Sequence, residues 1–215
     1  MTILSTKKLK PNQRELLLNA GVSFVEYNAI DIKCTPFELP DDIKNVIITS
    51  QNGARAFIKK IAQSDIVENC FAVGEKTSAL LVQNDVKVIK TAQNASKLAD
   101  FIIKNYRSDQ FTYFCGKQRR GELPDTLKDA GVICKEVVVY EAYLNEQSFD
   151  QKFDGILFFS PSGVSAFAKA NTSKSIVFCI GETTASEARK HFETVVVSNA
   201  TTIESTIAKA VKTLE

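Results

Sequence analysis

The chain of 215 residues is poor in the residues that build several common kinds of active site. It has one histidine, no tryptophan and one methionine. With His191 as the single imidazole, a multi-histidine metal site or a Ser-His-Asp triad would have to be built around one residue. The five cysteines are scattered and form no CxxC pair. We therefore expect reduced thiols in a cytoplasmic protein, and neither a disulfide framework nor a zinc site.

Long apolar runs and a strong charge of one sign are also missing. No segment approaches the ~20 apolar residues that span a bilayer. Residues 1–10 contain three lysines with no apolar region behind them, so we expect no secretory signal. The net charge of +2 argues against a nucleic-acid-binding protein, which usually has a strongly basic face. A nucleotide cofactor is not expected, because the chain has no Walker A sequence and no GxGxxG.

What the chain does have is an internal repeat. The repeated segments are 47–57 with 157–167, 5–22 with 115–132, and 72–77 with 179–184. The first two pairs have an offset of 110 residues and the third an offset of 107. Two similar halves predict two similar domains, and a cleft between two domains is a common place for a ligand.

Short apolar runs rich in valine, isoleucine and phenylalanine alternate with helical patterns, which is typical of βα units and parallel sheets. The expected strands are 2–5, 22–27, 45–49, 70–73, 86–89, 110–115, 132–140, 154–159, 176–180 and 193–197. The expected helices are 11–20, 53–63, 76–83, 95–105, 120–130, 162–170, 182–191 and 201–213. These elements predict an α/β fold with two five-stranded parallel sheets, each flanked by helices.

The order of the repeats leaves two partitions open, one tandem and one interleaved. Segments 29–40 and 141–152 are polar, and the first contains two prolines, so they are the plausible linkers. An interleaved chain needs two crossovers, whereas a tandem boundary near 105–110 would be too short to look like a linker. Interleaving is therefore favoured. The expected parts are a discontinuous domain 1–30 and 146–215, a continuous domain 36–138, and linkers 31–35 and 139–145.

Small hydroxyl residues and glycine follow several of these strands and open the next helix. They combine hydroxyls with free backbone N–H groups at a helix start, which suits phosphate or carboxylate. Plain helix capping is the better explanation of any one motif taken alone, but four motifs at matched positions weaken that explanation. The candidate binding residues are Thr49, Ser50, Asn52, Gly74, Lys76, Thr77, Ser160, Ser162, Gly163, Gly181, Thr183 and Thr184, with Lys7 and Lys117 adding positive charge.

The motifs also occur in a recognisable order along nearly the whole chain. They are Ser5-Thr6-Lys7, Thr49-Ser50-Gln51-Asn52-Gly53, Val73-Gly74-Glu75-Lys76-Thr77, Gly116-Lys117-Gln118-Arg119-Arg120-Gly121-Glu122-Leu123-Pro124, Val139-Tyr140-Glu141-Ala142, Phe159-Ser160-Pro161-Ser162-Gly163 and Ile180-Gly181-Glu182-Thr183-Thr184-Ala185. Each motif is weak alone, but the ordered set resembles the uroporphyrinogen-III synthase family.

The resemblance implies two interleaved flavodoxin-like domains, joined by a two-strand linker, with the active site in the cleft. It implies that hydroxymethylbilane is cyclised to uroporphyrinogen III, with loss of one water and inversion of the last pyrrole ring. No cofactor or metal is implied. The early position is usually arginine in this family. Lys7 keeps the charge there but loses the bidentate fork.

The resemblance assigns Tyr140 as the acid on the leaving hydroxyl, while a ring packed at the hinge is the structural alternative. Tyr143 is a nearby competitor, and Tyr27 is expected at the corresponding place in the first repeat. The expected partner is a linear tetrapyrrole polycarboxylate, with no nucleic acid and no membrane. We expect a monomer, with a transient contact to the preceding pathway enzyme as an open option.

Two other functions stay open at this point. The first is a non-catalytic two-domain binding or sensor protein that closes on a small anionic ligand. The second is a glycosyl-transferring enzyme with two facing α/β domains, which the small size of the chain disfavours. Incubation with hydroxymethylbilane separates them, because neither alternative forms uroporphyrinogen III.

Overall fold

The computed structural model describes residues 1–40, 43–61, 67–119 and 121–215. The chain forms two compact units. Unit 1 comprises Met1–Asp31 and Tyr143–Glu215, and unit 2 comprises Ile32–Ala142. The points where the chain passes between the units lie within the predicted linkers 31–35 and 139–145. None of the described helices is long and apolar enough to cross a membrane.

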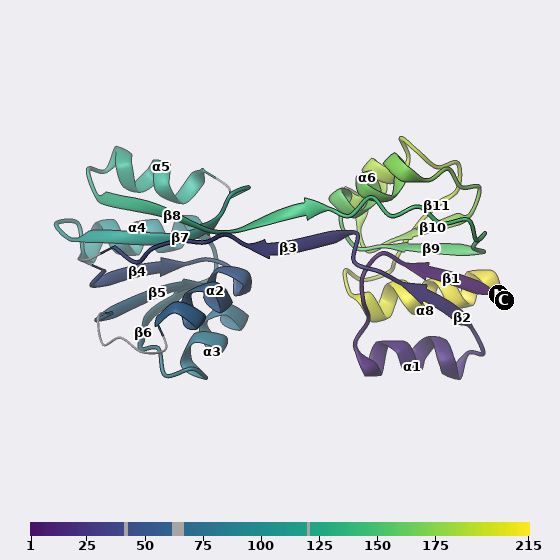
Figure 1. Ribbon diagram of the computed structural model, residues 1–215, viewed down its shortest axis with the longest axis horizontal. Helices are drawn as coiled ribbons and strands as arrows, with labels where there is room; N and C mark the ends of the chain where they lie inside the picture. Colours follow the sequence, from purple (N-terminus) through teal and green to yellow (C-terminus); the bar gives the residue numbers. More distant parts are fainter. Residues whose placement is uncertain (41–42, 62–66, 120) are drawn as a thin grey trace. The chain divides into compact units, whose positions relative to one another are not determined.

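Unit 1 is a parallel sheet with helices on both faces (Figure 1). Its strands are β1 (Thr2–Ser5), β2 (Ser23–Glu26), β9 (Gly155–Phe158), β10 (Ile176–Cys179) and β11 (Val195–Val197). Its helices are α1 (Pro11–Asn19), α6 (Pro161–Ala170), α7 (Glu182–Ala188) and α8 (Ile203–Leu214). The strand order β11-β10-β9-β1-β2 is the flavodoxin-like order.

Unit 2 has the same arrangement with one strand more among the described residues. Its strands are β3 (Ile30–Cys34), β4 (Asn45–Ile48), β5 (Asn69–Val73), β6 (Val88–Ala92), β7 (Gln110–Gly116) and β8 (Ile133–Leu144). Its helices are α2 (Gln51–Ile61), α3 (Glu75–Val82), α4 (Ala95–Asn105) and α5 (Glu122–Asp129). The strand order is β3-β8-β7-β4-β5-β6. The prediction of five strands for this sheet was therefore wrong by one.

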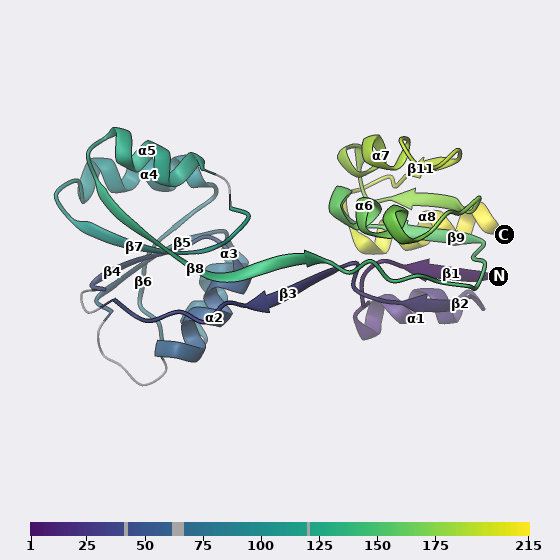
Figure 2. The same cartoon turned by 45° about the horizontal axis from the view of Figure 1, so that its top comes forward.

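The additional strand is β3, which pairs with the long strand β8 and runs in the opposite direction (Figures 1 and 2). The family resemblance implies a strand in the linker 31–35, whereas the polar residues and the two prolines of 29–40 do not themselves indicate one. Apolar and charged residues alternate along Ile30–Cys34, however, which is the pattern of a strand with two different faces. The backbone N–H of Thr35 donates to the carbonyl of Val139 at 3.0 Å, so the pairing continues beyond β3.

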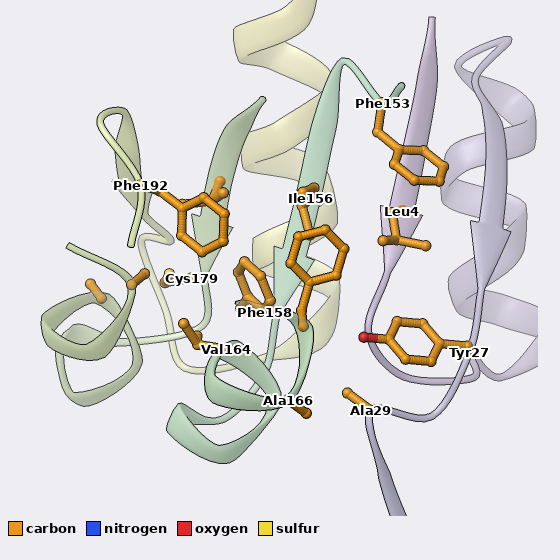
Figure 3. Packing of buried hydrophobic residues seen from close by; sticks show 14 residues of the cluster. Leu4, Tyr27, Ala29, Phe153, Ile156, Phe158, Val164, Ala166, Cys179 and Phe192 are labelled. Atoms are coloured by element: carbon orange, nitrogen blue, oxygen red, sulfur yellow. The ribbon is translucent and has the colours of Figure 1, made fainter. Parts of the chain in front are cut away.

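Alternation along the central strands divides the core of each unit into two layers. In unit 1, Leu4 packs with the layer under α6 and α7, and its neighbour Ile3 packs with the layer under α1 and α8. Figure 3 shows the first of these layers, which is rich in phenylalanine. In unit 2, Ile48 belongs to the layer under α2 and α3, and Ile47 to the layer under α4 and α5. Continuous apolar strands are thus covered on both faces.

Matching signals end the two corresponding helices α1 and α5. Gly21 and Gly131 adopt φ values of +66° and +78°, in the left-handed region where glycine has no Cβ penalty. Val22 and Val132, which follow these glycines, donate backbone hydrogen bonds to Leu17 and Leu127. The repeat in the sequence therefore corresponds to a repeat in helix termination.

Candidate functional site

The strand order locates one switch point in each sheet. In unit 1 the order reverses between β1 and β9, and in unit 2 it reverses between β7 and β4. Ligands of open parallel sheets bind outside the carboxyl ends of the strands at such a point. The candidate binding residues follow the carboxyl ends of strands, so each unit has one candidate edge, whereas Tyr140 lies within β8.

At the edge of unit 1, hydrogen bonds hold the segment after β1 against β9. Thr6 is buried, and both its backbone N–H and its hydroxyl donate to the carbonyl of Leu157, at 3.1 and 2.7 Å. The carbonyl of Lys7 accepts a hydrogen bond of 2.6 Å from the hydroxyl of Ser5. The Lys7 side chain is exposed. Its backbone is therefore fixed, while its ammonium group can reach an anion in solvent.

The start of α6 lies beside this segment. The Ser160 hydroxyl accepts a hydrogen bond of 3.1 Å from the Gly163 N–H and caps the helix. A Cβ on Gly163 would lie 3.2 Å from Ser160 Oγ and 3.7 Å from Thr6 Oγ1. The structure thus brings Ser160 and Gly163 together with the end of β1, while Ser162 is exposed to solvent.

At the start of α7, the two threonines that we predict to bind together differ in their exposure to solvent. The carbonyl of Gly181 accepts the N–H of Thr184 at 3.1 Å. The Thr184 side chain is 3% exposed and packs into the unit, whereas Thr183 is exposed. Only Thr183 therefore presents its hydroxyl to solvent, and Thr184 contributes to the packing of the helix start.

In unit 2 the start of α3 repeats this division. Gly74 has a φ of +83°, and its carbonyl accepts the N–H groups of Thr77 and Ser78, both at 3.1 Å. Thr77 is buried and Lys76 is exposed. In the sequence repeat, Lys76 corresponds to Thr183 and Thr77 to Thr184. One exposed donor and one buried threonine thus open the corresponding helix in both units.

The start of α2 carries three of the predicted residues. The Ser50 hydroxyl accepts the N–H of Gly53 at 3.0 Å, as Ser160 does in α6. The Asn52 side-chain oxygen accepts a hydrogen bond of 3.3 Å from Arg55. Thr49 is half-buried, and its hydroxyl lies 2.9 Å from the hydroxyl of Tyr113 on β7. Sequence patterns identified Tyr113 only as part of a strand, because its contact with Thr49 depends on the pairing of β4 with β7.

Tyr140 lies on β8 at the same edge of unit 2. Its half-buried ring packs against Gly116, where an added Cβ would lie 2.6 Å from Tyr140 Cζ and 2.9 Å from its hydroxyl oxygen. The pairing of β7 with β8 shifts register between Cys115 and Gly116, which brings Gly116 opposite Tyr140. The Lys117 N–H donates to the carbonyl of Tyr140 at 2.9 Å. Gly116 thus provides the room in which the phenol ring is held.

Charged pairs flank this ring. Lys117 forms an ion pair of 2.9 Å with Glu141, the residue after Tyr140. Arg119 contacts Glu136 on β8 through two nitrogens, with Nη2 2.7 Å from Oε1. Burial raises the pKa of the neighbouring Cys115 thiol to about 11, so this thiol stays neutral. Sequence patterns identify Arg119 only as part of the motif that runs from Gly116 to Pro124. Arg120, from the same motif, lies outside the described residues.

Sheet register corrects the correspondence between the repeats. Leu157 of β9 pairs with Ser5, whereas the matching residue of β4, Ile47, pairs with Tyr113. Tyr113, and not Cys115, is therefore the structural counterpart of Ser5. Because β7 extends further than β1, the exact match of Lys7 with Lys117 in the sequence is not a match in the sheets.

Tyr27 is likewise not the counterpart of Tyr140. Ser5 pairs with Glu26 and Tyr113 pairs with Glu136, so Tyr27 corresponds to the residue after Glu136. The Tyr27 ring is buried within the apolar layer of unit 1 (Figure 3). Burial raises the pKa of Tyr27 to about 12. Its position inside the core offers no contact with a ligand at the sheet edge.

The described residues contain no group of three or more histidine, cysteine, aspartate or glutamate side chains that could hold a metal ion. The single histidine, His191, is exposed and lies 3.4 Å from the Glu187 carboxylate. What each edge does offer is hydroxyls, a lysine and helix starts, which suit carboxylates.

Comparisons with known proteins point to one family. A family model described as uroporphyrinogen-III synthase HemD matches residues 13–208. The chain is 26% identical to a uroporphyrinogen-III synthase from Chlorobaculum parvum over 219 aligned residues, which cover 88% of this chain and 89% of the relative.

Solved structures show the same fold. A uroporphyrinogen-III synthetase from Helicobacter pylori matches with a TM-score of 0.72, at 19% identity and 99% coverage of both chains. A mutant uroporphyrinogen III synthase from Thermus thermophilus matches with a TM-score of 0.58, at 12% identity and full coverage of both chains. The prediction of two flavodoxin-like α/β parts built on parallel sheets is thereby confirmed.

Proposed function

The chain belongs to the uroporphyrinogen-III synthase family, and we propose that Tyr140 and the helix starts at the two sheet edges carry out the reaction of that family. Members of the family are enzymes of tetrapyrrole biosynthesis. They convert hydroxymethylbilane into uroporphyrinogen III with loss of one water and inversion of the last pyrrole ring. Membership in the family favours the enzyme over the sensor and glycosyl-transfer alternatives.

The reaction defines what the residues must supply. The terminal hydroxyl leaves as water, so its C–O bond must break while a proton is delivered to the oxygen. The linear substrate also cyclises without help, but then the last ring is not inverted. The protein must therefore hold the substrate so that the substituted carbon of that ring is attacked. A proton donor and several carboxylate-binding groups are the minimum set.

Tyr140 is our candidate for the proton donor. The observation that supports it is the close packing of its ring on Gly116, which fixes a half-buried phenol at the carboxyl edge of unit 2. A positioned acid accelerates a reaction by roughly 10²–10⁴-fold. When Tyr140 gives its proton to the leaving hydroxyl, water departs, and a proton from solvent later restores the phenol.

The carboxylates of the substrate are proposed to bind at the helix starts. The exposed or half-buried donors there are Lys7, Thr49, Ser50, Asn52, Lys76, Lys117, Ser160, Ser162 and Thr183. We propose that Gly74, Gly163 and Gly181 let the backbone come close to a carboxylate. Thr77 and Thr184 support the backbone at their helix starts. Backbone N–H groups at helix starts bind anions without a large net charge, which is consistent with a chain of net charge +2.

The test is incubation of the purified protein with hydroxymethylbilane, followed by separation of the uroporphyrinogen isomers. We expect the inverted isomer, and formation of the uninverted isomer alone would contradict the proposal. Tyr140→Phe should slow turnover by roughly 10²-fold or more with no loss of folded protein. Tyr143→Phe is the matched control, since Tyr143 lies three residues further along β8 and is exposed. Equal rates for Tyr140→Phe and the parent would remove Tyr140 from the acid role.

We also propose a monomer in the cytoplasm in which 1–30 with 146–215, and 36–138, are separate folding domains. A transient contact with the preceding pathway enzyme would protect the reactive substrate from spontaneous cyclisation. Light scattering after gel filtration tests the monomer. Transfer of substrate in the presence of a trapping reagent tests the contact.

A further inference from the structure

A hydrogen bond joins the two strands that flank the switch point of unit 2. The Thr49 hydroxyl lies directly after β4, and it is 2.9 Å from the Tyr113 hydroxyl on β7. The two strands are neighbours in the sheet, with Ile47 opposite Tyr113. The bond therefore lies at the carboxyl edge where a ligand of an open α/β sheet binds.

Burial decides which hydroxyl donates. Tyr113 is 4% exposed, and burial raises its pKa, so the phenol keeps its proton. Within the part of the chain that the structure describes, Thr49 is the one hydrogen-bond partner of this phenol. A buried O–H without an acceptor costs free energy, so the Tyr113 proton points to Thr49 Oγ1. The hydroxyl proton of Thr49 is then available for another acceptor, and the Thr49 side chain is only half-buried.

Unit 1 shows that the fold does not need this pair. Its sheet has the same strand order, but Ser5 takes the place of Tyr113 and bonds to the carbonyl of Lys7. In the sequence repeat, Phe159 takes the place of Thr49. Unit 1 thus forms its edge with Ser5 and Phe159 where unit 2 has two hydroxyls that bond to each other. Because the same fold forms in unit 1 without such a pair, the Thr49–Tyr113 pair of unit 2 points to a role in binding.

We propose that Tyr113 is a positioning residue that acts through Thr49. By donating to Thr49 Oγ1, Tyr113 fixes the threonine hydroxyl as a donor toward a carboxylate of the substrate. A chain of two hydrogen bonds is also cooperative, because each bond polarises the next. The proposal rests on the function proposed above and adds a residue that touches no substrate itself.

A double-mutant cycle tests this role. Tyr113→Phe keeps the ring and removes the donor, and Thr49→Val keeps the shape and removes the second hydroxyl. Each single variant should lower kcat/KM for hydroxymethylbilane by about three- to tenfold, the effect of one hydrogen bond. The loss should appear as a higher KM. In the Thr49→Val background, Tyr113→Phe should cause no further loss, whereas Thr49→Ser should restore the dependence on Tyr113.

Two controls keep the outcome unambiguous. Tyr106→Phe removes a phenol from the same unit where the ring packs against Phe71, and it should leave kcat/KM unchanged. Urea unfolding of each variant separates lost stability from lost binding. The proposal would be overturned if Tyr113→Phe lowered kcat/KM equally in the parent and in the Thr49→Val background. An unchanged KM in Tyr113→Phe would also overturn it. An inactive parent protein would instead overturn the proposed function.

Discussion

The phenol ring of Tyr140 fills the space that any side chain on Gly116 would occupy. An ideal Cβ on Gly116 would come within 2.6 Å of Tyr140 Cζ, far inside van der Waals contact. The two residues are also paired across β7 and β8, so the backbone cannot easily separate them. The position of the proposed acid therefore depends on the absence of a side chain at Gly116 on the neighbouring strand.

Gly116→Ala should consequently impair catalysis more than folding. The added methyl group must push the Tyr140 ring aside, and a misplacement of about 1 Å can cost about 10²-fold in rate. Overpacking of this kind lowers stability by about 1–3 kcal/mol. Steady-state kinetics and urea unfolding measure the two effects.

Gly21→Ala is the matched control for Gly116→Ala. Gly21 has a φ of +66° and open space around it, so alanine there adds backbone strain of roughly 1–2 kcal/mol without touching Tyr140. It should lose stability and keep the parent kcat. Full activity in Gly116→Ala would show that the packing on Gly116 does not position the acid.

Ser160→Ala should distinguish binding from capping at a helix start. Ser160 and Thr202 cap α6 and α8 through equal hydrogen bonds of 3.1 Å, so alanine should cost about 1 kcal/mol of stability at either position. Only Ser160 lies at the switch point, so only Ser160→Ala should raise KM. An equal KM in both variants would reduce Ser160 to a helix cap.

Tyr27→Phe should stabilise the protein. The Tyr27 hydroxyl is buried without a hydrogen-bond partner among the described residues, and an unsatisfied buried group costs about 1–3 kcal/mol. Removing the oxygen leaves the ring and its edge contact with Phe149 in place. We expect a gain of about 1 kcal/mol in urea unfolding, with unchanged kinetics. A loss of stability would mean that the hydroxyl has a partner such as an internal water.

The buried thiols should make the protein sensitive to alkali. Burial raises the pKa of Cys70 from its ordinary 9.0 to about 12. Above pH 9 the unfolded chain loses this proton while the folded chain keeps it. The stabilisation is therefore complete below pH 9 and is lost as the pH rises toward 12.

Cys70→Ala should flatten this pH dependence by roughly 1 kcal/mol per pH unit between pH 9 and 11. The measurement is urea unfolding at a series of pH values. Cys34→Ala controls for the loss of a thiol as such, because Cys34 is exposed. An unchanged slope in Cys70→Ala would show that this thiol ionises as readily in the folded chain as in the unfolded one.

The helices could be predicted well because the residues that begin and end a helix lie within it or next to it in the sequence. Pro11 begins α1 and Gly21 follows its end, and Ser160 caps α6, all as the sequence indicates. The alternation of apolar and charged residues in Ile30–Cys34 is equally local, and it marks the strand that the linker forms.

Properties that depend on strand register could not be predicted. The bond between Thr49 and Tyr113 needs Ile47 to pair with Tyr113, and no pattern within either strand specifies this alignment. The same limit explains the misplaced counterpart of Tyr140. A sequence offset of 110 counts residues along the chain, whereas contacts across a sheet depend on where each strand begins to pair.

The position of β1 in its sheet has a consequence for synthesis of the chain. β1 pairs with β2 on one side and with β9 on the other, and β9 is made about 150 residues later. At typical rates of elongation this interval lasts roughly 8–30 s. Throughout it, β1 presents one unpaired edge, so this strand is where we expect nascent chains to need a chaperone.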